Sequence, residues 1–535
     1  MTERLKVTKR GVLATALAAS LTLGAFLPLP ALGAQEALAP ATFPTAEAER
    51  VLSFGFDVIA ERYLEPVTVE QLALDGLRGL GQLDPGLAIA MRDHNVELST
   101  AERVVASFKA PAPDDSQDWA DVAVRLTVAA RSVSPALAKA SAEDVYAAVF
   151  DAILADLDHF SRYASAAEAR SNRARRNGFG GVGIRYSVEN DRLDIREVLP
   201  ETPASRIGLR IGDAITHIDG APVGTLGDRD AISERMRGPM NSALRLTVIR
   251  AGESVASDMT IRRGLVVPQT VTLENTDDGV ATIRITSFNQ RTAKGVSEAL
   301  DKAKRQLGRD MRGVLLDLRG NPGGLLDQAV SVSDMFINQG RIVFTRGRHP
   351  EAMQSYSART GDTVNGLPVV VLLDGRSASA AEIVAAALQD SGRAVVIGSA
   401  SYGKGTVQTV IRMPNDGEMT LTWSRFHSPS GYALHGLGVL PTVCVTDAAA
   451  SADTLLANVA SASTPLASQF ALWRSTPLED KQARQDLRTL CPPTNQADWA
   501  SDTEVARRLL SDHAMFARAL SATAVKSAAV EAGRY

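Results

Sequence analysis

The first part of the chain has its hydrophobic residues at helical spacing. Between residue 51 and about residue 170, segments such as VLSFGFDVIAERYL and VEQLALDGLRGLGQL place apolar residues three or four positions apart, which predicts amphipathic helices. Residues 141–160 form another such segment, and its first residues carry a helix start signal. The segment APAPDDS at 110–116 predicts a break, and the Ala- and Pro-rich residues 35–50 predict a linker. We therefore expect a helical N-terminal region at 35–176.

The hydrophobic period changes to two at residues 177–199, NGFGGVGIRYSVENDRLDIREVL, where glycines come first and alternation follows. One short helix around 203–208, several turn dipeptides and a terminal strand, ALRLTVIRAGE, complete this part of the chain. Short strands joined by tight turns are typical of a small β-rich domain. These features predict a compact β-rich module at 177–266.

Residues 267–445 alternate between strand and helix patterns. The predicted strands are GVATIRI, RGVLLDLRG, LPVVVLLD and RAVVIGS, and the helices between them include TAKGVSEALDKAKRQL, LLDQAVSVSDMFI and SAAEIVAAALQDS. Because nearly continuous Val, Leu and Ile strands must be buried on both faces, we expect a partly parallel sheet covered by helices. Residues 446–535 are rich in Ala and Arg and predict helices without indicating a function. The predicted fold class is therefore α/β, in a multidomain chain.

The length and charge of the chain limit its classes of partner. With 535 residues the chain is too long for one hydrophobic core, so we expect three or four domains. Hydrophobic residues make up 45% of the chain, and the net charge is −4 at pH 7. This balance lacks the basic footprint of nucleic-acid binding and the polybasic patch of a membrane-surface protein. We therefore expect no nucleic acid among the partners.

The N-terminus predicts export. A basic start, MTERLKVTKR, is followed by an apolar stretch that ends in small residues, which is typical of a secretory signal peptide at 1–34. The apolar run is nearly long enough to span a bilayer, so an uncleaved N-terminal membrane anchor is the alternative. In either case we expect the protein to work in the periplasm or at the cell envelope.

Cysteines and ligand motifs give little support to a metal or a cofactor. The two cysteines, Cys444 and Cys491, can form a disulfide in an oxidising compartment, and two buried thiols are the alternative. The sequence contains no CxxC, no HExxH and no cluster of His and Cys, so we expect no metal site. GSASYGKGT matches the opening of a phosphate loop, but Gly405 stands where that loop needs a magnesium-binding hydroxyl. We therefore expect no nucleotide and no other cofactor.

Two loops that follow predicted strands carry the candidate chemistry, because ligands gather at the carboxyl edge of α/β sheets. The first loop, DLRGNPGGLLD at 317–327, has Gly323 and Gly324 ahead of a helix. Backbone N–H groups in such a loop suit an anion or a developing oxyanion. A plain turn from strand to helix is the alternative interpretation.

The second loop, GRSASAAEI, places Ser379 at the start of a helix. Ser379 and Glu382 fit the capping box S-x-x-E, in which both side chains satisfy backbone donors. The positive end of a helix also suits a nucleophile whose reaction develops negative charge. The two interpretations are compatible, because Ser377 can take the structural role. A nucleophilic serine needs a base, and His427 or His435 would supply one in a conventional serine–histidine pair.

Lys404 is the other candidate base. It is the only lysine between Lys304 and Lys481, although arginine is frequent in this part of the chain. A desolvated lysine can give up its proton, whereas arginine in a protein cannot. Gln408 would share a strand face with Lys404 and could orient the amine without adding a charge. A solvated lysine in a turn is the alternative interpretation.

Several segments, taken together, resemble one protein family. GVLLDLRGNPGGLLDQAV, SASAAEIVAAALQDSGRAVVIG, YGKGTVQ and SPSGYALHGLGVLPTV resemble the carboxyl-terminal processing peptidases, also called tail-specific serine proteases. VFDAILADLDHFSRYAS resembles the helix and acidic turn that precede the PDZ domain of these proteins, and residues 178–265 look like that domain. The resemblance spans about 141–445. It implies a ClpP/crotonase-like protease core at 267–445, next to the PDZ domain at 177–266.

The resemblance also implies roles for individual side chains. Ser379 matches the family's nucleophile, the second serine of its S-A-S motif, and Lys404 matches the base in F/Y-G-K-G. Gln408 matches the third member of the catalytic set. Asp390 falls on an acidic position whose role we expect to be structural.

The resemblance also implies which backbone N–H groups bind the oxyanion and the terminal carboxylate of the substrate. The oxyanion donors would be the N–H groups of Ala380 and of one glycine, with Gly324 favoured over Gly323. In the PDZ domain, the glycine-bearing segment GGVGI at 180–184 would seat the terminal carboxylate of a peptide that adds as a strand. The residues implied there are Gly181, Val182, Gly183 and Ile184.

The implied function is that of an exported serine endopeptidase. It would recognise protein substrates by their apolar C-terminal tails through the PDZ domain and cleave them with a serine–lysine pair. The alternative from another class is an inactive protease-like PDZ scaffold, or a protein that binds hydrophobic ligands. The residues before 141 and residues 446–535 do not match the family's common core, so a homo-oligomer or an adaptor stays open.

Overall fold

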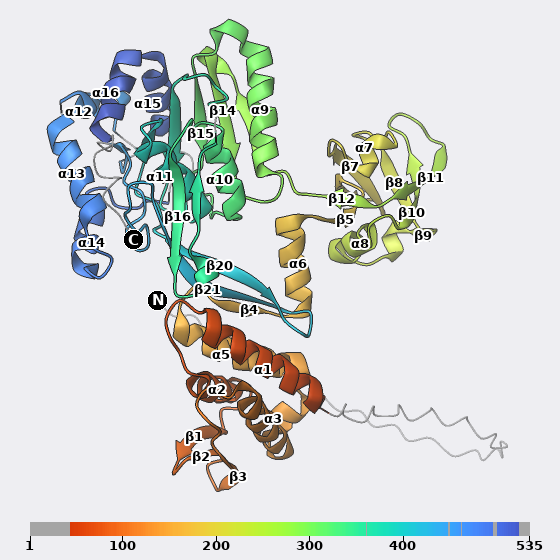
Figure 1. Cartoon of the computed structure of the whole chain (residues 1–535). Coiled ribbons are helices and arrows are strands. Elements are labelled where there is room, and N and C mark those ends of the chain that lie inside the picture. Colours follow the sequence, from red (N-terminus) through yellow and green to blue (C-terminus); the bar gives the residue numbers. More distant parts are fainter. Residues whose placement is uncertain (1–42, 360, 448–449, 462, 496–499, 524–535) are drawn as a thin grey trace, which may run out of the picture. The chain divides into compact units, whose positions relative to one another are not determined.

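The computed structural model describes residues 43–523, except 360, 448–449, 462 and 496–499 (Figure 1). The predicted signal peptide and nearly all of the predicted linker lie outside the described residues. The linker prediction is wrong at its end, because helix α1 (Thr45–Arg62) already begins at Thr45. The segment TAEAER consists mostly of strong helix formers, and helix propensity outweighs the small-residue composition that suggested a linker.

The N-terminal region is a helical bundle with a small sheet. Its helices are α1, α2 (Val69–Arg78), α3 (Ser116–Val133), α4 (Pro135–Lys139) and α5 (Ala142–Leu157). They enclose a core whose largest fully buried side chains include Phe56, Trp119 and Phe150. The predicted start of α5 is confirmed, since Ser141 and Asp144 form a capping box. The break at 110–116 is confirmed as the loop before α3.

The all-helical prediction for this region is wrong at residues 88–109. These residues form an antiparallel sheet of β1 (Ala88–Arg92), β2 (Asn95–Ser99) and β3 (Val104–Lys109). Asp93 and His94 join the first two strands with positive φ angles of 48° and 64°. Two successive positive φ angles are the geometry of a tight hairpin turn, and this turn overrides the weak helical spacing around it.

The β-rich module is a five-stranded antiparallel sheet with additional short pairings. Its strand order is β11-β10-β8-β7-β6, so β6 is an edge strand. The strands are β5 (Phe179–Gly181), β6 (Ile184–Glu189), β7 (Arg192–Val198), β8 (Ala214–Ile218), β9 (Ala221–Pro222), β10 (Ala243–Ile249), β11 (Ala256–Arg262) and β12 (Gly264–Val266).

Two helices complete the module. The short helix α7 (Pro203–Arg206) confirms the one predicted around 203–208. A second helix, α8 (Arg229–Met236), was not predicted. It buries only Ile232 and Met236, and two apolar residues in a polar stretch are too few to reveal a helical period.

The third region contains a six-stranded, mostly parallel sheet. Its order is β13 (Val271–Asn275), β14 (Val280–Ile285), β15 (Gly313–Asp317), β18 (Val369–Leu373), β19 (Ala394–Gly398) and β22 (Val443–Cys444). Every residue of β15, β18 and β19 is buried. Strand β13 is antiparallel to β14, and the other pairs are parallel. The α/β fold class and the partly parallel sheet are therefore confirmed.

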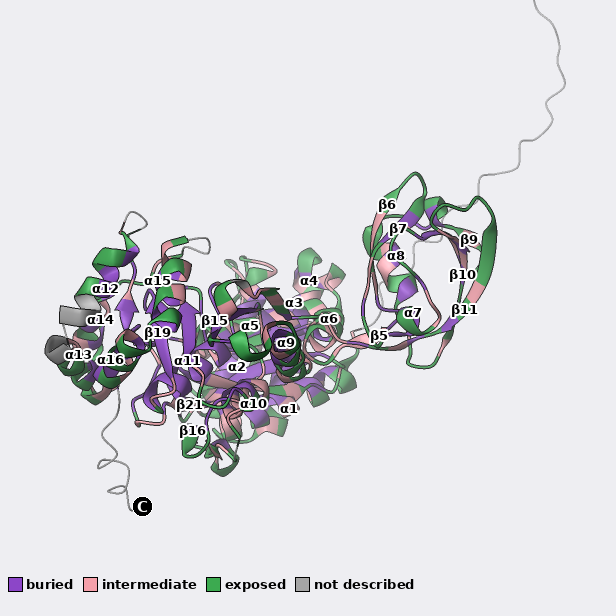
Figure 2. Ribbon diagram, turned by 90° about the horizontal axis from the view of Figure 1, so that it is seen from above, coloured by how far each residue is buried: buried purple, intermediate pink, exposed green. Residues whose placement is uncertain are grey.

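Helices cover both faces of this sheet (Figures 1 and 2). On one face, Val314 and Leu316 pack in a core cluster with α9 (Thr292–Leu307), α10 (Leu326–Asp334) and α11 (Ala380–Asp390). On the other face, Leu315 packs in a second cluster with α12 (Ala452–Ser461), α15 (Ala500–Ser511) and α16 (His513–Thr523). The helices of residues 446–535 are thus part of the covering layer of the sheet.

A second sheet links this core to the N-terminal bundle. Its order is β17 (Ser355–Ser357), β16 (Arg341–Gly347), β21 (Glu418–His427) and β20 (Thr406–Arg412), and β4 (Arg162–Ala164) also pairs with β21. Met413, Met419 and Leu421, on or beside these strands, pack into the core of the bundle. Helix α6 (Ala166–Asn177) follows β4.

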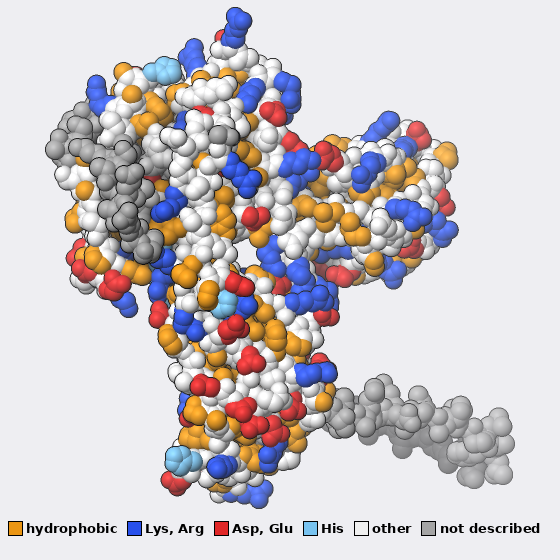
Figure 3. Space-filling model, in the orientation of Figure 1, with side chains coloured by type: hydrophobic (Ala, Val, Ile, Leu, Met, Phe, Trp, Pro, Cys, Tyr) orange, Lys and Arg blue, Asp and Glu red, His pale blue; other side chains and the backbone are white. Residues whose placement is uncertain are grey.

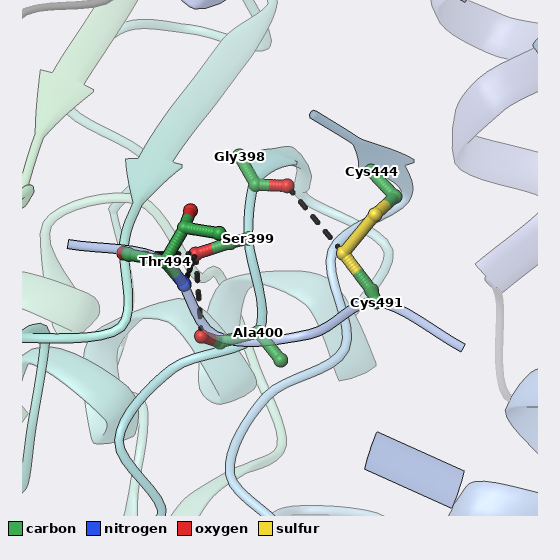
Figure 4. The surroundings of a disulfide bond; sticks show 6 residues. All are labelled: Gly398, Ser399, Ala400, Cys444, Cys491 and Thr494. Carbon is green, nitrogen blue, oxygen red and sulfur yellow. Dashed lines mark hydrogen bonds between the residues drawn. A yellow bond between two sulfur atoms is a disulfide. The ribbon is translucent and has the colours of Figure 1, made fainter. Parts of the chain in front are cut away.

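A disulfide joins Cys444 in β22 to Cys491, which follows α13 (Ser463–Ser475) and α14 (Lys481–Arg488) (Figure 4). Of the two interpretations that the sequence left open, the disulfide is therefore confirmed. It ties the part of the chain after α14 to an edge strand of the main sheet, across a sequence separation of 47 residues.

The described surface is of mixed charge. On the face shown in Figure 3, Lys and Arg side chains are interspersed with Asp and Glu side chains. Within residues 43–523, apart from the gaps above, no His, Cys, Asp and Glu side chains are grouped to hold a metal ion. A search of the same residues for a helix with the length and apolarity of a membrane span found none.

Candidate active site

One cavity of about 470 Å³ brings together the glycine loop, Ser379 and Lys404, which the sequence proposed for the chemistry. Its lining includes Ser379, Ala380, Lys404, Gln408 and the pair Gly323–Gly324. The glycine pair follows β15, Ser379 follows β18, and Lys404 follows β19. These three strands are parallel neighbours, so their carboxyl ends deliver the three loops to one edge of the sheet.

Ser379 has a strained backbone at the first turn of α11. Its φ is 54° and its ψ is −115°, a conformation that costs a non-glycine residue about 1–3 kcal/mol. A sharp, strained turn from strand to helix is also how hydrolases project a nucleophilic serine from a sheet. Ser379 is partly exposed and lines the cavity, whereas Ala378 and Ala380 on either side are buried.

Ser377 fixes the loop that leads to Ser379. It is fully buried, and its hydroxyl donates to the Leu318 carbonyl at 2.9 Å and accepts from the Asp374 N–H at 2.9 Å. The first serine of the SAS segment therefore anchors the nucleophile loop to the end of β15. This leaves the structural role with Ser377, as the sequence allowed.

The glycine loop lies directly against the serine. A Cβ atom on Gly323 would come within 2.7 Å of Ser379 Cβ and within 2.9 Å of the Ala380 nitrogen. The Gly323 N–H already donates to Asn321 Oδ1 at 2.9 Å, so Gly323 is less suited to be an oxyanion donor than Gly324, the glycine that the sequence favoured. Among the described residues, the N–H groups of Gly324 and Ala380 have no hydrogen-bond partner, and both residues line the cavity. They are the two donors free to bind an oxyanion.

Lys404 lies inside the cavity with its amine 4.9 Å from the centroid of the Phe160 ring. Burial lowers the pKa of Lys404, the positive charge of Arg162 lowers it further, and the carboxylates of Asp158 and Glu382 oppose this shift. In this conformation the amine and the Ser379 hydroxyl share the cavity without a hydrogen bond between them, a common feature of sites without substrate. A half-buried amine with a lowered pKa is suited to accept a proton.

Gln408 lines the same cavity, but its amide is directed to neighbouring threonines. The amide nitrogen donates to Thr406 Oγ1 at 2.9 Å and to Thr422 Oγ1 at 3.2 Å. Thr422 in turn donates to Asp158 at 3.1 Å. The proposed role of Gln408 in orienting the lysine therefore stays a prediction, whereas its position on the cavity wall is observed.

Glu382 is the residue whose importance the sequence underestimated. It is fully buried and accepts hydrogen bonds from the N–H groups of Ser379 at 2.7 Å, Gly403 at 2.6 Å and Lys404 at 2.9 Å. It also accepts from the Ser401 hydroxyl. Burial raises the pKa of Glu382, and these four hydrogen bonds oppose the shift. One carboxylate thus holds the backbone of the nucleophile and of the lysine together; the capping box was the only signal for it.

The histidine alternative has no support in this geometry. His427 stacks on Phe344, with ring centroids 4.9 Å apart, and its Nδ1 lies 3.2 Å from the Gly431 carbonyl oxygen. His435 lies edge-on to Phe160. Neither histidine lines the cavity that contains Ser379. Asp390, as expected, is structural, since it binds Arg474 and Ser430.

A second groove, of about 270 Å³, lies in the β-rich module. It is lined by the predicted carboxylate-binding residues, by part of β6 and by α8; these lining residues include Gly181, Val182, Gly183, Ile184, Ser233 and Met236. Because β6 is the edge strand beside this groove, an extended peptide can pair with it.

Comparison with known families identifies the class of the protein. The model of peptidase family S41 matches residues 279–445, which contain the glycine loop, Ser379 and Lys404. The model of a PDZ domain matches residues 195–250, within the β-rich module. The protein is therefore a serine peptidase that carries a PDZ domain, and the alternative of a non-catalytic scaffold is set aside.

Individual relatives narrow the class to a family. The chain is 38% identical over 295 residues to a carboxy-terminal-processing protease of Bartonella bacilliformis, covering 55% of this chain and 68% of that protein. It is 33% identical over 307 residues to a carboxyl-terminal-processing protease of Synechocystis, covering 56% and 70%. Among solved structures, it matches a photosystem II D1 C-terminal processing protease with 22% identity, 75% and 95% coverage, and a TM-score of 0.35. The chain belongs to the carboxyl-terminal-processing proteases, as the sequence motifs predicted.

We predict that replacing Glu382 disrupts catalysis more than substrate binding. Glu382→Ala leaves four buried donors without an acceptor, which costs about 1–3 kcal/mol for each unsatisfied group and lowers the melting temperature. The loops of Ser379 and Lys404 lose their common anchor, so kcat should fall about 100-fold. The measurement is steady-state kinetics beside thermal unfolding, with the exposed Glu298→Ala as control; an unchanged kcat in the folded Glu382 variant would contradict the anchoring role.

We predict that Gly324→Ala removes oxyanion binding. A Cβ atom there would lie 2.0 Å from the Phe288 carbonyl oxygen, and the φ of 146° is accessible essentially only to glycine, so the N–H must move. Loss of one such donor lowers kcat by about 10²–10³-fold. Gly392→Ala is the matched control, because it has a positive φ of 67° and open space around the new Cβ. Equal kinetics in the two variants would exclude Gly324 as the donor.

Proposed function

We propose that the protein is an exported endopeptidase in which Ser379 is the nucleophile and Lys404 is the general base. The observation that carries the proposal is the single cavity that holds both side chains beside the free N–H groups of Gly324 and Ala380. The lowered pKa of Lys404 favours the neutral amine that a base requires. Gln408, on the same wall, is the candidate for orienting that amine.

The proposed reaction proceeds through an acyl-enzyme. Ser379 Oγ attacks the peptide carbonyl while the neutral Lys404 amine takes its proton. The carbonyl oxygen becomes negative and is stabilised by the N–H groups of Gly324 and Ala380, supported by the N-terminal end of α11. Lys404 then gives the proton to the leaving amine, and a water molecule activated by the same amine hydrolyses the ester. No step in this sequence draws on a metal or a nucleotide.

We further propose that the groove in the PDZ domain binds the C-terminal tail of the substrate. The tail would add to the edge of β6, and its carboxylate would meet backbone N–H groups of the segment 181–184. Ile184, Met236 and Val266 line this groove and favour an apolar side chain at the end of the tail. The substrate class is therefore proteins with a free, apolar C-terminus.

Export is proposed from two independent features. The N-terminal segment is typical of a secretory signal peptide. The Cys444–Cys491 disulfide is of a kind that persists in oxidising compartments such as the bacterial periplasm. The proposed location is the periplasm or the cell envelope.

The catalytic pair predicts a defined set of inactive variants. Ser379→Ala should lower kcat by about 10⁴-fold or more, and Lys404→Arg by about 10²–10⁴-fold, because arginine keeps its charge and cannot act as a base. As the pH falls through the pKa of Lys404, the amine becomes protonated and activity is lost. Since burial lowers this pKa, the acidic limb should lie below the usual range of lysine. The assay is cleavage of an unfolded reporter with an apolar C-terminus across pH; an active Lys404→Arg enzyme would remove the lysine from the mechanism.

Tail recognition predicts a KM effect from one position of β6. Ile184→Glu places a carboxylate in the groove, where it repels the substrate's terminal carboxylate, so KM for the tailed reporter should rise about tenfold or more. Val188→Glu is the control, because Val188 lies on the same strand, is 41% exposed and does not line the groove. A reporter whose C-terminus is amidated should be cleaved with a high KM by both variants. If Ile184→Glu leaves KM unchanged for the free tail, recognition does not use this groove.

A further inference from the structure

The segment from Arg484 to Thr494, called here the brace, contacts the loops that carry the proposed catalytic residues. It comprises the end of α14 and the residues that follow it as far as Thr494. The composition of this part of the chain indicated no function. Its hydrogen bonds reach the loop before Ser379 and the loop before Lys404.

Arg488 is attached to the loop of the lysine. Its guanidinium donates to the Leu437 carbonyl at 2.6 Å and to the Ser401 carbonyl at 3.0 Å. Ser401 lies three residues before Lys404, and its hydroxyl donates to Glu382. Arg488 and Glu382 therefore both bind the segment 401–404. Arg488 binds its first carbonyl, and Glu382 accepts from the Ser401 hydroxyl and from two of its N–H groups.

Arg484 supports the other side of that loop. It donates to the carbonyls of Ala433 at 2.5 Å and His435 at 2.8 Å. The next residue, Gly436, donates its N–H to the Gly403 carbonyl at 2.9 Å. Two arginines thus support the backbone ahead of Lys404. Arg488 binds the Ser401 carbonyl directly, and Arg484 supports the Gly403 carbonyl through the neighbouring loop that contains Gly436.

Thr494 joins the two catalytic loops to each other. Its carbonyl accepts from the Gly375 N–H at 2.7 Å, and Gly375 opens the loop that leads to Ser379. Its own N–H donates to Ser399 Oγ at 3.1 Å, on the loop that leads to Lys404 (Figure 4). A displacement of the brace would therefore disturb both the loop that leads to Ser379 and the loop that leads to Lys404.

Arg484 and Arg488 both bind backbone carbonyls with their guanidinium groups. Among the described residues, neither Arg484 nor Arg488 forms an ion pair, and burial lowers the pKa of both guanidinium groups. Burying a charge without a counter-ion is costly unless its donors are satisfied. Backbone carbonyls bind the terminal nitrogens of both guanidinium groups, whereas the buried Nε of Arg484 has no hydrogen-bond partner among the described residues. Carbonyl acceptors fix the position of the backbone that bears them, which an ion pair between side chains would not do.

We propose that the brace is a positioning element of the proposed active site, in which Arg488 fixes the Lys404 loop and the Cys444–Cys491 disulfide keeps the brace in place. The disulfide connects the brace to β22, and Cys491 Sγ lies 3.7 Å from the Gly398 carbonyl oxygen at the start of the same loop (Figure 4). The proposal rests on the proposed function of Ser379 and Lys404. Arg488 acts through the loop and does not touch the substrate.

The charged groups around Lys404 determine what loosening the loop would do. Asp158 at the end of α5, Arg162 in β4 and Glu382 in α11 face the amine, and Arg175 and Arg176 of α6 line the same cavity. These groups do not belong to the brace and stay in a brace variant. A looser loop lets water reach the amine, which weakens the main cause of its lowered pKa. The acidic limb of the rate profile should then move to higher pH.

The first test compares three substitutions in the full-length protein. Arg488→Ala should lower kcat about 10- to 100-fold with little change in KM, and it should move the acidic limb of kcat to higher pH. Arg488→Lys should recover only part of kcat, because one ammonium group matches the two-carbonyl geometry less well than a guanidinium. Val505→Ala is the control; it opens a cavity in the buried face of α15, so it should lower the melting temperature and leave kcat and the limb unchanged.

The outcomes separate the two proposals. An inactive Ser379→Ala enzyme together with a normal kcat and normal limb in folded Arg488→Ala overturns the brace alone. An active Ser379→Ala enzyme overturns the proposed function and the brace with it. If Arg488→Ala loses kcat only in proportion to its lost melting temperature, with an unmoved limb, the arginine is merely structural and the proposal is wrong.

The second test addresses the disulfide. Dithiothreitol converts Cys444–Cys491 to two thiols through a mixed disulfide and is itself oxidised to its cyclic disulfide. Reduction should lower kcat several-fold, and removal of the reductant with reoxidation should restore it. The Cys444→Ser/Cys491→Ser double variant should have the lower kcat from the outset and should not respond to dithiothreitol. Equal kcat in the oxidised, reduced and double-variant enzymes would show that the disulfide does not hold the brace.

Discussion

The buried carboxylate of Glu382 is the interaction on which the arrangement of the site depends. Ser379 and Lys404, the proposed catalytic residues, lie on different loops, and loops are the most mobile parts of a fold. Glu382 holds the two loops in a fixed relative position, because its carboxylate accepts hydrogen bonds from the N–H groups of Ser379 and Lys404 at the same time. A carboxylate that is fully buried and accepts four hydrogen bonds is both costly to bury and difficult to displace. The strained backbone of Ser379 persists because its N–H is held in this way.

The main sheet explains why a single residue, Glu382, can be sufficient to fix the loops of the site relative to one another. Strands β15, β18 and β19 are parallel neighbours and buried on both faces, so their carboxyl ends cannot shift relative to one another without disrupting two cores. Three loops therefore start from fixed points, and Glu382 has only to fix the short distance from those points to the reacting atoms. The N-terminal bundle adds Asp158, Phe160 and Arg162 to the wall of Lys404, which sets the charge around the amine.

The sequence predicted the parts of this arrangement that depend on local pattern. The continuous apolar strands identified the sheet, and the isolated lysine and the SAS segment identified Lys404 and Ser379. It favoured Gly324 over Gly323 as the oxyanion donor, but it did not reveal that Asn321 binds the Gly323 N–H and leaves that of Gly324 free. The pairing of β4 with β21 depends on contacts between segments more than 250 residues apart, since Ala164 pairs with Glu418, and no local period reveals such contacts.

The contacts of the C-terminal region, residues 446–535, give it a structural role beside the candidate active site. Its Ala- and Arg-rich composition predicted helices without indicating a function, yet α12, α15 and α16 cover one face of the six-stranded sheet. Asp502 of α15 lies 3.7 Å from Arg319, in the loop that contains the two glycines, and burial raises the pKa of Asp502 to about 6. Together with Arg488 and Thr494, this brings residues after 446 to all three catalytic loops.

Arginine is the suitable residue for such contacts because its fork of donors can bind two carbonyls and keeps its charge when buried, whereas a lysine in the same surroundings would lose its proton. The chain accordingly has arginines where backbone carbonyls are held in position, whereas Lys404, with its lowered pKa, lines the cavity beside Ser379.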